Sequence, residues 1–179
     1  MWVVARIAES QAKVEGWYRE YGGALLRYLA RRFGRMGADD LLQETFVQAL
    51  RRPRRVGETV SPRAWLFGIA RHVGVSAFRR KRVMAELPES IEARAGDVDE
   101  RMDEMRQAIA KLPHEMRETL ELRLADDLSY EEIAAVLQIP VGTVRSRLHS
   151  AVKKLREEMC HERCEAGTVD DGCSAGGAQ

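Results

Sequence analysis

The chain has 179 residues, with 29 lysines and arginines against 28 aspartates and glutamates, and 45% of its residues are hydrophobic. This length suits one or two small domains, which excludes most multi-domain enzymes, and the apolar content excludes a chain that is disordered throughout. No apolar run approaches the roughly 20 residues of a membrane helix, and Trp2–Ala5 is too short for the core of a signal peptide. We therefore expect a cytoplasmic protein that is rich in helices and does not insert into a membrane.

The near-zero net charge hides an uneven distribution along the chain. Residues 1–83 carry 17 basic and 7 acidic side chains, residues 84–104 carry 2 and 8, residues 105–159 carry 9 of each, and residues 160–179 carry 1 and 4. A basic block, an acidic strip and a mixed block indicate two domains with a linker between them. The basic block suits a polyanionic partner, although a solvated cationic surface would have the same composition.

Two amphipathic helices are predicted in the basic block. The first spans about Val14–Phe33, where large apolar residues recur every four positions, and Gly34 and Gly37 end it. The second begins at Asp39, whose side chain can cap it, and Pro53 stops it. We expect its buried face to contain Leu42, Phe46 and either Ala49 or Leu50.

A third helix is predicted to begin at Ser61-Pro62, a capping hydroxyl followed by proline at the first helical position. We expect it to bury Trp65, Ile69 and Val73 and to run into the basic segment 79–82. Because no alternating strand pattern occurs, the block is predicted to be a small helical bundle.

Two polar clusters in this bundle are candidate binding surfaces. One is an acidic-polar patch of Asp39, Asp40, Gln43 and Glu44. It is either a solvated first turn that complements the helix dipole or a docking surface for a basic protein. The other cluster, beside Trp65 and Phe78, consists of Arg71, Arg79, Arg80, Lys81 and Arg82. It is either a solvated face or a surface that contacts phosphates and unstacked bases.

Residues 84–104 are predicted to form an extended acidic linker, with a helical turn near its end. Pro88 and Gly96 interrupt the segment, and its apolar periodicity is weak. About 18 extended residues span at most about 60 Å, whereas one turn of B-DNA is about 34 Å. The linker is therefore long enough to hold two domains on sites nearly two turns apart on one duplex face.

The C-terminal block is predicted to contain a helix-turn-helix. Two helices flank Pro113, and their inward positions are Met105, Ile109, Leu112, Met116, Leu120 and Leu124. After a turn at Asp126-Asp127, Ser129 and Glu132 form a capping box that starts a short helix with Ile133, Ala134 and Leu137 facing inward. A tight turn at 138–140 leads into a longer helix from about Val141 to Glu158, which buries Val144, Leu148, Val152 and Leu155.

On this last helix, Arg145, Ser146, His149 and Lys153 share the face opposite the apolar stripe. The face is either the polar side of an ordinary amphipathic helix or a surface that enters the major groove of DNA. Beyond the helix lie Cys160, His161, Cys164 and Cys173. Three thiols and one imidazole suit a zinc site or a redox switch, and the other interpretation is free thiols in a disordered tail over residues 160–179.

Several segments together resemble the extracytoplasmic-function, or group 4, sigma factors of bacterial RNA polymerase. Ala38–Phe46 is similar to the polymerase-docking segment of sigma region 2, and Pro62–Arg71 to the segment that handles the melted −10 element. The pieces similar to region 4 are Leu112-Pro113, Ser129–Ala134 and Gly142–Leu148. The resemblance covers about residues 14–158, and its specificity comes from finding both regions in this order around an acidic linker.

The resemblance implies an all-α fold of two small helical domains, region 2 in residues 1–83 and region 4 in residues 105–159, joined by the acidic linker 84–104. It implies an initiation subunit with no catalysis, cofactor, metal or small-molecule substrate of its own. Its partners would be core RNA polymerase, promoter DNA and a cognate anti-sigma factor. The residues that would bind the polymerase clamp helices are Asp39, Asp40, Gln43, Glu44 and Phe46.

The resemblance also assigns DNA-binding residues. A loop with Val56, Gly57, Glu58 and Thr59 would hold, with His72, a base flipped out of the −10 strand. The other −10 residues would be Trp65 and Arg71, with Arg79, Arg80, Lys81 and Arg82 on the phosphates. The −35 element would be contacted by Thr143, Arg145, Ser146, Arg147, His149 and Lys153.

Four positions depart from the family pattern. His72 stands where the family usually has asparagine and Ser76 where it often has aspartate, which affects the −10 base preference. Gln138 stands where relatives often have glycine; if this position is left-handed, the side chain costs roughly 1–2 kcal/mol. Ser150 replaces a common arginine and removes one DNA contact.

Two rival functions remain open from the sequence. A stand-alone helix-turn-helix regulator would bind duplex DNA as a dimer, but it leaves the basic first domain and its acidic patch unexplained. An enzyme would need a set of catalytic or ligand-binding residues at a recognisable spacing. The sequence has no glycine-rich phosphate loop, no metal-ligand set in its folded part, and no Ser/His/Asp or Cys/His arrangement placed by spacing.

Overall fold

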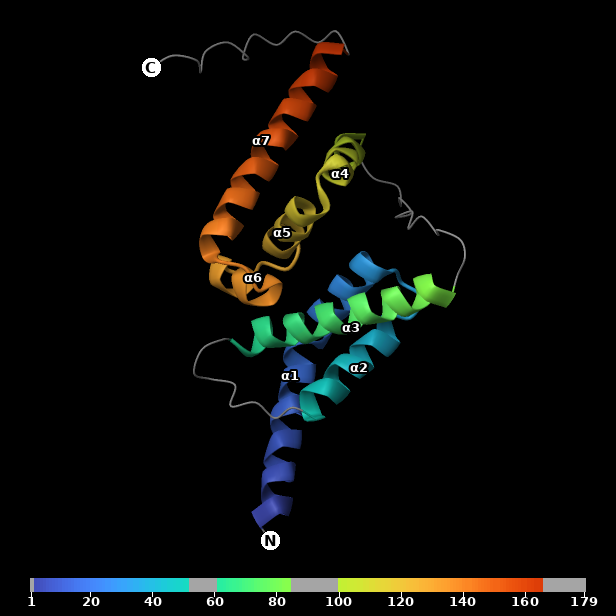
Figure 1. Cartoon of the computed structure of the whole chain (residues 1–179), viewed down its shortest axis with the longest axis vertical. Helices are drawn as coiled ribbons and strands as arrows, with labels where there is room; N and C mark the ends of the chain where they lie inside the picture. The colour runs from blue at the N-terminus through green and yellow to red at the C-terminus, as the bar shows by residue number, and fades with distance from the viewer. Residues whose placement is uncertain (1, 52–60, 85–99, 166–179) are drawn as a thin grey trace.

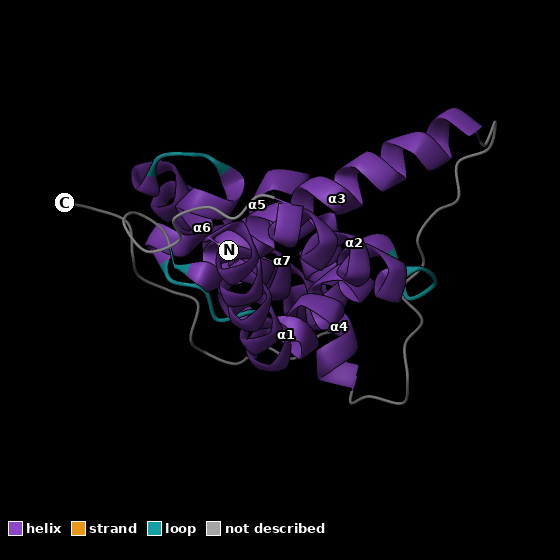
Figure 2. Cartoon of the chain, turned by 90° about the horizontal axis from the view of Figure 1, so that it is seen from below, coloured by secondary structure: helices purple, strands orange, loops and turns teal. Residues whose placement is uncertain are grey.

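A computed structural model describes the backbone of residues 2–51, 61–84 and 100–165 and the side chains of residues 11–51, 61–80 and 104–160. Every regular element within these ranges is a helix (Figures 1 and 2). The helices are α1 (Trp2–Phe33), α2 (Ala38–Arg51), α3 (Pro62–Met84), α4 (Glu100–Lys111), α5 (His114–Leu124), α6 (Tyr130–Leu137) and α7 (Val141–Glu165). The predicted all-α fold of two small helical domains is confirmed.

Helices α1, α2 and α3 pack against one another as the first unit. Leu25 and Leu29 of α1 and Leu66 and Phe67 of α3 are fully buried between them. The prediction for α3 was partly wrong, because only Val73 of its expected stripe is buried and Trp65 is half-exposed. The physical reason is that α3 is covered by α1 and α2 on one side and by α6 on another, so a single stripe does not describe it.

The ends of the first three helices follow local signals, with two differences. Helix α3 begins at Pro62 as predicted, and the Ser61 hydroxyl accepts a hydrogen bond from the Ala64 amide at 3.1 Å. Helix α2 begins one residue before Asp39, so Asp39 lies in its first turn and the Gly37 carbonyl accepts from the Leu41 amide. Helix α1 begins at Trp2, twelve residues before the predicted start, and its N-terminal part projects from the bundle (Figure 1).

One glycine sets the distance between α1 and α3. A Cβ added to Gly74 would overlap the ring of Phe33, and Gly74 is itself buried. The two helices can therefore approach closely at this position only because residue 74 lacks a side chain.

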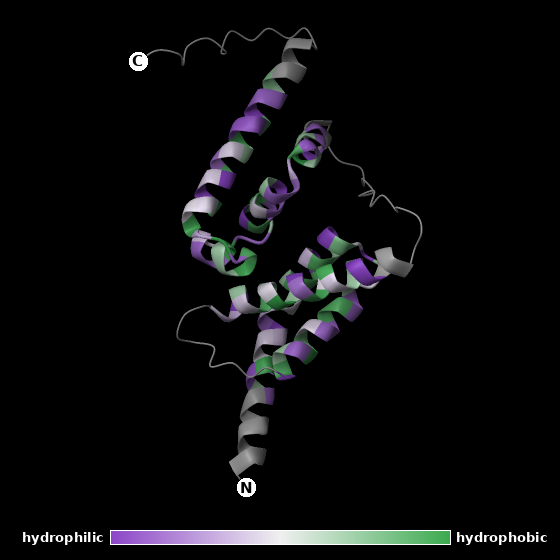
Figure 3. Ribbon diagram, in the orientation of Figure 1, coloured by the Kyte–Doolittle hydropathy of each residue, from purple (hydrophilic) through white to green (hydrophobic). Residues whose placement is uncertain are grey.

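Helices α4 to α7 form the second unit, whose apolar residues are concentrated in α6 and on the inner faces of its neighbours (Figure 3). Helix α4 starts at Glu100, so the last five residues of the predicted linker are helical. Two expected core residues are exposed: Leu124 is 69% exposed and Val152 40%. On α7, Ala151 is buried instead of Val152, because the side of the helix that α4, α5 and α6 cover contains residue 151.

The helix-turn-helix is confirmed in detail. The Ser129 hydroxyl accepts from the Glu132 amide at 3.1 Å, and the Glu132 carboxylate accepts from the Ser129 amide at 3.0 Å, which completes the predicted capping box. Gln138 ends α6 in the left-handed conformation, with φ 56° and ψ 46°. The turn then delivers the chain to α7, which starts at Val141.

Helix α7 continues to Glu165, so the prediction of a disordered tail was wrong for residues 160–165. No glycine or proline occurs between Val141 and Glu165 except Gly142 in the first turn, and nothing in the sequence stops the helix earlier. Among the described helices, none combines the length and hydrophobicity that a bilayer span requires.

The two units contact each other directly. Helix α6 packs on α3, and Glu118 of α5 pairs with Arg32 near the end of α1 and with Arg71 in the middle of α3 (Figure 1). The contact between the units therefore lies on the same helix, α3, that carries the predicted −10 residues.

Gln138→Gly is expected to stabilise the second unit by about 1 kcal/mol, because glycine adopts the left-handed conformation without the steric cost of a Cβ. Gln138 is exposed, so its side chain contributes little packing. The measurement is the free energy of unfolding in urea. Gln138→Ala is the matched control, since it shortens the side chain but keeps the Cβ. Equal stability of the Gly and Ala variants would contradict the prediction.

Candidate nucleic-acid interface

The N-terminal half of α7 presents the polar face that the sequence predicts for DNA. Arg145, Ser146, His149 and Lys153 are all exposed, while Val144 is buried on the opposite face. The Ser146 hydroxyl donates to the Thr143 carbonyl at 3.0 Å, which leaves the hydroxyl oxygen as an acceptor. The guanidinium of Arg145 can donate two hydrogen bonds to one base edge in the major groove.

Arg147, also predicted for this surface, lies differently from its neighbours. Its side chain is 21% exposed and pairs with Glu115 of α5. This pair joins α5 to α7 within the second unit. A DNA phosphate would have to share this guanidinium with a carboxylate, so Arg147 is placed less favourably for DNA than Arg145 is.

The acidic-polar patch lies on the first two turns of α2. Asp39, Asp40 and Gln43 are exposed, and Glu44 is half-exposed and accepts a hydrogen bond from the Gln48 side chain at 3.1 Å. Phe46, predicted for the same surface, is 6% exposed and packs edge-on against Tyr18, with ring centroids 5.0 Å apart. Phe46 therefore supports the patch from below rather than lying on its surface.

Three apolar side chains near this patch were missed by the sequence reasoning. Tyr18, Val47 and Leu50 are 52%, 36% and 41% exposed, on α1 and α2. For Val47 and Leu50, the signal in the sequence was that α2 contains more apolar residues than one buried stripe can hold. An apolar rim beside exposed carboxylates is typical of a surface that binds another protein.

The predicted −10 residues are only partly brought together. His72, Arg79 and Arg80 are exposed on α3, and Trp65 is half-exposed and contacts Trp17 edge-on at 5.7 Å. Lys81 and Arg82 continue α3, which projects from the bundle at this end (Figure 2), but their side chains lie outside the description. The predicted loop residues Val56, Gly57, Glu58 and Thr59 lie outside the described residues.

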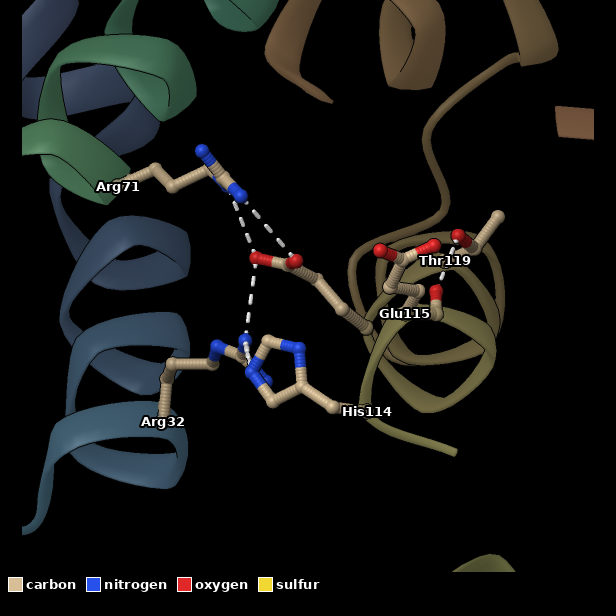
Figure 4. Close-up of polar contacts among 6 residues, drawn as sticks. Arg32, Arg71, His114, Glu115 and Thr119 are labelled. Carbon is tan, nitrogen blue, oxygen red and sulfur yellow. Dashed lines mark hydrogen bonds and ion pairs between the residues drawn. The ribbon is translucent and has the colours of Figure 1, made fainter. Parts of the chain in front are cut away.

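Among the predicted −10 residues with described side chains, Arg71 is the one that forms an ion pair. Its Nε donates to Glu118 Oε1 at 2.9 Å and its Nη2 to Oε2 at 3.4 Å (Figure 4). Arg32 of α1 approaches the same Oε1 at 3.2 Å and lies 2.5 Å from His114 Nε2. Nothing in the sequence indicates this cluster, because an acidic residue on a short helix is normally expected to face solvent, whereas Glu118 is only 4% exposed.

Three further residues of the first unit contact the second unit. Arg31 Nη2 lies 2.6 Å from Asp126 Oδ2, and Arg63 donates to the backbone carbonyls of Asp126 and Asp127. Ser61 donates from its hydroxyl to Glu132 Oε1 at 2.6 Å. All the cations come from the first unit, and every acceptor comes from the second.

These contacts change the pKa values of the groups involved. Burial raises the pKa of Asp126, and the opposing effect of Arg31 does not cancel it. Burial opposes ionisation of Glu132, but hydrogen bonds from Ser61 and Ser129 and the charge of Arg63 together lower its pKa. The hydrogen bond to Glu118 raises the pKa of Arg71 despite its partial burial. Burial lowers the pKa of His114, and Arg32 lowers it further.

The cysteine-containing segment forms no recognisable metal site within the described residues. Cys160 is exposed on α7, and Cys164 follows one turn later in the same helix. No cluster of three or more histidine, cysteine or acidic side chains occurs among the residues whose side chains are described. Cys173 lies outside them, so the zinc and redox hypotheses stay predictions.

Comparison with known proteins gives matches to both units. The family model for sigma-70 region 2 matches residues 17–83, and that for sigma-70 region 4 matches residues 102–155. The chain is 34% identical over 164 residues to RNA polymerase sigma factor YlaC of Bacillus subtilis, covering 85% of this chain and 95% of that protein. It is 33% identical over 159 residues to ECF RNA polymerase sigma factor SigL of Mycobacterium tuberculosis, covering 83% and 90%.

A solved structure is similar across most of the chain. It is the sigma factor RpoE of Bartonella quintana in complex with the anti-sigma factor NepR, with a TM-score of 0.59 and 26% identity. The match covers 83% of this chain and 99% of that one.

His114→Gln is expected to reduce the loss of stability on acidification. The folded-state pKa of His114 lies below its ordinary value of about 6.5, so the folded protein binds fewer protons and loses stability as the pH falls through that value. The charges facing this ring are Arg32, Arg71, Arg117 and Glu118. The measurement is the free energy of unfolding at pH 7.5 and 5.5.

The pKa values of Asp126 and Glu121 are raised by burial, which favours the folded state as the pH falls and so opposes the effect of His114. Both residues are present in wild type and in His114→Gln, so the difference between these two proteins reports on His114. His72→Gln is the matched control, since His72 is exposed. An equal loss of stability in wild type and His114→Gln would contradict the prediction.

Proposed function

The chain belongs to the extracytoplasmic-function sigma factors of the sigma-70 family, and from this premise we propose how its residues divide the recognition of polymerase and promoter. The protein binds core RNA polymerase and directs initiation at promoters with two DNA elements. Residues 1–83 act as region 2 and residues 105–159 as region 4. The segment 84–104 links them.

The −35 element is contacted by α7. The observation that supports this most is the exposed row of Arg145, Ser146, His149 and Lys153 on a helix that follows a capped α6 and a tight turn. Side chains near the start of such a helix reach base edges, and those further along reach phosphates. We therefore assign Arg145 to a base and Lys153 to the backbone, with Thr143 and Arg147 at the margin.

The −10 element is contacted by α3 and the segment before it. Arg71, Arg79 and Arg80 supply cations, and Lys81 and Arg82 extend the same basic segment. Trp65 and His72 offer ring faces to an unstacked base. The residues Val56, Gly57, Glu58 and Thr59 would complete the base pocket.

Core polymerase docks on α2. Asp39, Asp40, Gln43 and Glu44 form the polar part of this surface, with Phe46 behind it. An acidic surface with an apolar rim suits a basic protein partner, because charge complementarity orients the encounter and apolar burial holds it.

The protein acts in the cytoplasm, has no catalytic reaction of its own and requires no cofactor. An anti-sigma factor controls it, which is supported by the similarity to a sigma factor solved with its anti-sigma factor. The alternative function, a stand-alone helix-turn-helix regulator, is distinguished by whether duplex DNA is bound tightly without polymerase.

The test of this function is run-off transcription on fragmented genomic DNA with core polymerase, with and without the protein. Protein-dependent starts that share two upstream motifs are expected. Arg145→Ala should weaken recognition of the upstream motif by about 1–3 kcal/mol at one base position, whereas Lys153→Ala should weaken all promoters alike. No protein-dependent start, together with tight duplex binding in the absence of polymerase, would overturn the proposal in favour of the regulator.

The docking surface is tested by Asp40→Ala combined with Glu44→Ala. Retention on immobilised core polymerase is expected to fall about tenfold or more, the worth of one charged hydrogen bond. Glu131→Ala combined with Glu157→Ala is the control, because it removes the same charge from exposed positions of the second unit. Unchanged retention of the first pair, with an unchanged circular dichroism spectrum, would contradict the docking assignment.

A further inference from the structure

We propose that the end of α7 carries a binding site for a borderline-soft divalent metal ion such as Zn²⁺, with Cys160, His161 and Cys164 as its three protein ligands. These residues lie beyond residue 155, where the match to sigma region 4 ends, so membership of the family does not imply the site. The site is also independent of the proposed function, because it involves neither DNA nor polymerase.

The helical conformation of α7 brings the three ligand positions to one side. Helix α7 is continuous from Val141 to Glu165. Positions three and four residues apart are neighbours on the surface of a helix, so position 164 neighbours both Cys160 and His161. The three positions therefore form a triangle that spans just over one turn. Paired histidines that bind zinc from a single helix use the same spacing of four residues.

This spacing suits a metal ion better than a disulfide. Cβ atoms four positions apart in a helix are separated by about 5–6 Å, whereas a disulfide requires about 3.5–4.5 Å. Two sulfur–zinc bonds of about 2.3 Å each can span the wider gap. While α7 stays helical, Cys160 and Cys164 are therefore placed to share a metal ion and not to bond to each other.

The site lies on the accessible side of α7. Cys160 is exposed, and so is Lys153, which precedes it by seven residues and therefore shares its side of the helix. The buried side carries Leu148, Ala151 and Leu155. A hydrated ion can therefore reach Cys160 without any displacement of the packed core.

The surrounding charges also favour a cation. Residues 157–165 contain four glutamates and one arginine, and they form the last turns of α7. The dipole of a helix presents its negative end there, so the acidic side chains are repelled and a divalent ion relieves the repulsion.

The binding step exchanges ligands without any change of oxidation state. Each of the two thiols releases its proton to solvent, and the thiolate sulfur replaces a water molecule on the metal. The imidazole binds as the neutral base through a ring nitrogen. Three protein ligands leave one tetrahedral position to water, as in zinc sites that keep an open coordination position.

The structural effect of the metal is local to the end of the helix. Glu158 of α7 pairs with Lys111 of α4, which ties α7 to the second unit at that point. A metal ion bound by residues 160, 161 and 164 cross-links the turn that follows. Binding therefore stabilises the helical conformation of residues 160–165 and leaves the helix-turn-helix as it is.

The first test is a titration of the reduced full chain, without a histidine tag, with Co²⁺ as a spectroscopic substitute for Zn²⁺. We expect a thiolate-to-cobalt charge-transfer band and the intense visible bands of tetrahedral Co²⁺, saturating at one ion per chain and abolished by Zn²⁺. Cys160→Ser and Cys164→Ser are each expected to lose this spectrum. His161→Gln is expected to shift the visible bands, because a nitrogen ligand is removed.

The chain offers matched controls for both kinds of ligand. Cys173→Ser makes the same chemical change at the remaining cysteine, which lies outside the triad. His72→Gln removes an exposed histidine of the first unit. Both variants are expected to keep the wild-type spectrum, and circular dichroism checks that every variant is folded.

The second test compares amide hydrogen exchange in residues 160–165 with and without Zn²⁺. Exchange is expected to slow in the wild type, because the metal holds the last turns of α7 helical. Zn²⁺ is expected to have no effect in the variant that combines Cys160→Ser with Cys164→Ser.

The outcomes bear on the site alone. A wild type without the cobalt spectrum, or a spectrum that survives both cysteine variants of α7, would overturn the site. A spectrum lost in Cys173→Ser would overturn the assignment of the protein ligands to α7 alone. Zinc binding that leaves exchange in residues 160–165 unchanged would overturn the helical triad. Neither test uses DNA or polymerase, so these failures are distinct from a failure of the proposed function.

Discussion

The carboxylate of Glu118 is the point on which the arrangement of the two helical units depends. It is 4% exposed and lies between Arg71 of α3 and Arg32 of α1. A buried carboxylate without partners would cost several kcal/mol, so Glu118 can be buried only where both arginines reach it. The position of α5 against the first unit, and with it the packing of α6 on α3, follows from this requirement.

The local signals in the sequence predicted much of the fold. The starts of α3 and α6 were predicted at Pro62 and after Ser129, because a proline in the first turn and a capping box act within three or four residues. Partners far away in the chain decided the rest. Val152 is exposed and Ala151 buried because α4 and α5 fix which side of α7 is covered, and a stripe drawn from spacing alone does not contain that information.

The candidate surfaces were also predictable to different degrees, depending on whether they follow from local spacing or from partners far away in the chain. The polar face of α7 follows from its apolar stripe, since residues opposite a buried row must be exposed. The environment of Arg71 did not follow, because its partner is 47 residues away in the chain. The sequence shows which residues are basic. Among the residues with described side chains, however, the packing of the two units decides whether a basic residue binds Glu118 or faces solvent.

Glu132 contributes both to the fold of the second unit and to its contact with the first. One of its oxygens, Oε2, accepts from the Ser129 amide and completes the capping box of α6, while the other, Oε1, accepts from Ser61 of the first unit. Loss of the Ser61 contact leaves the capping box intact, because the two bonds use different oxygens. The helix-turn-helix therefore does not depend on the contact between the units for its own start. The same carboxylate thus serves one contact within the second unit and one contact between the units.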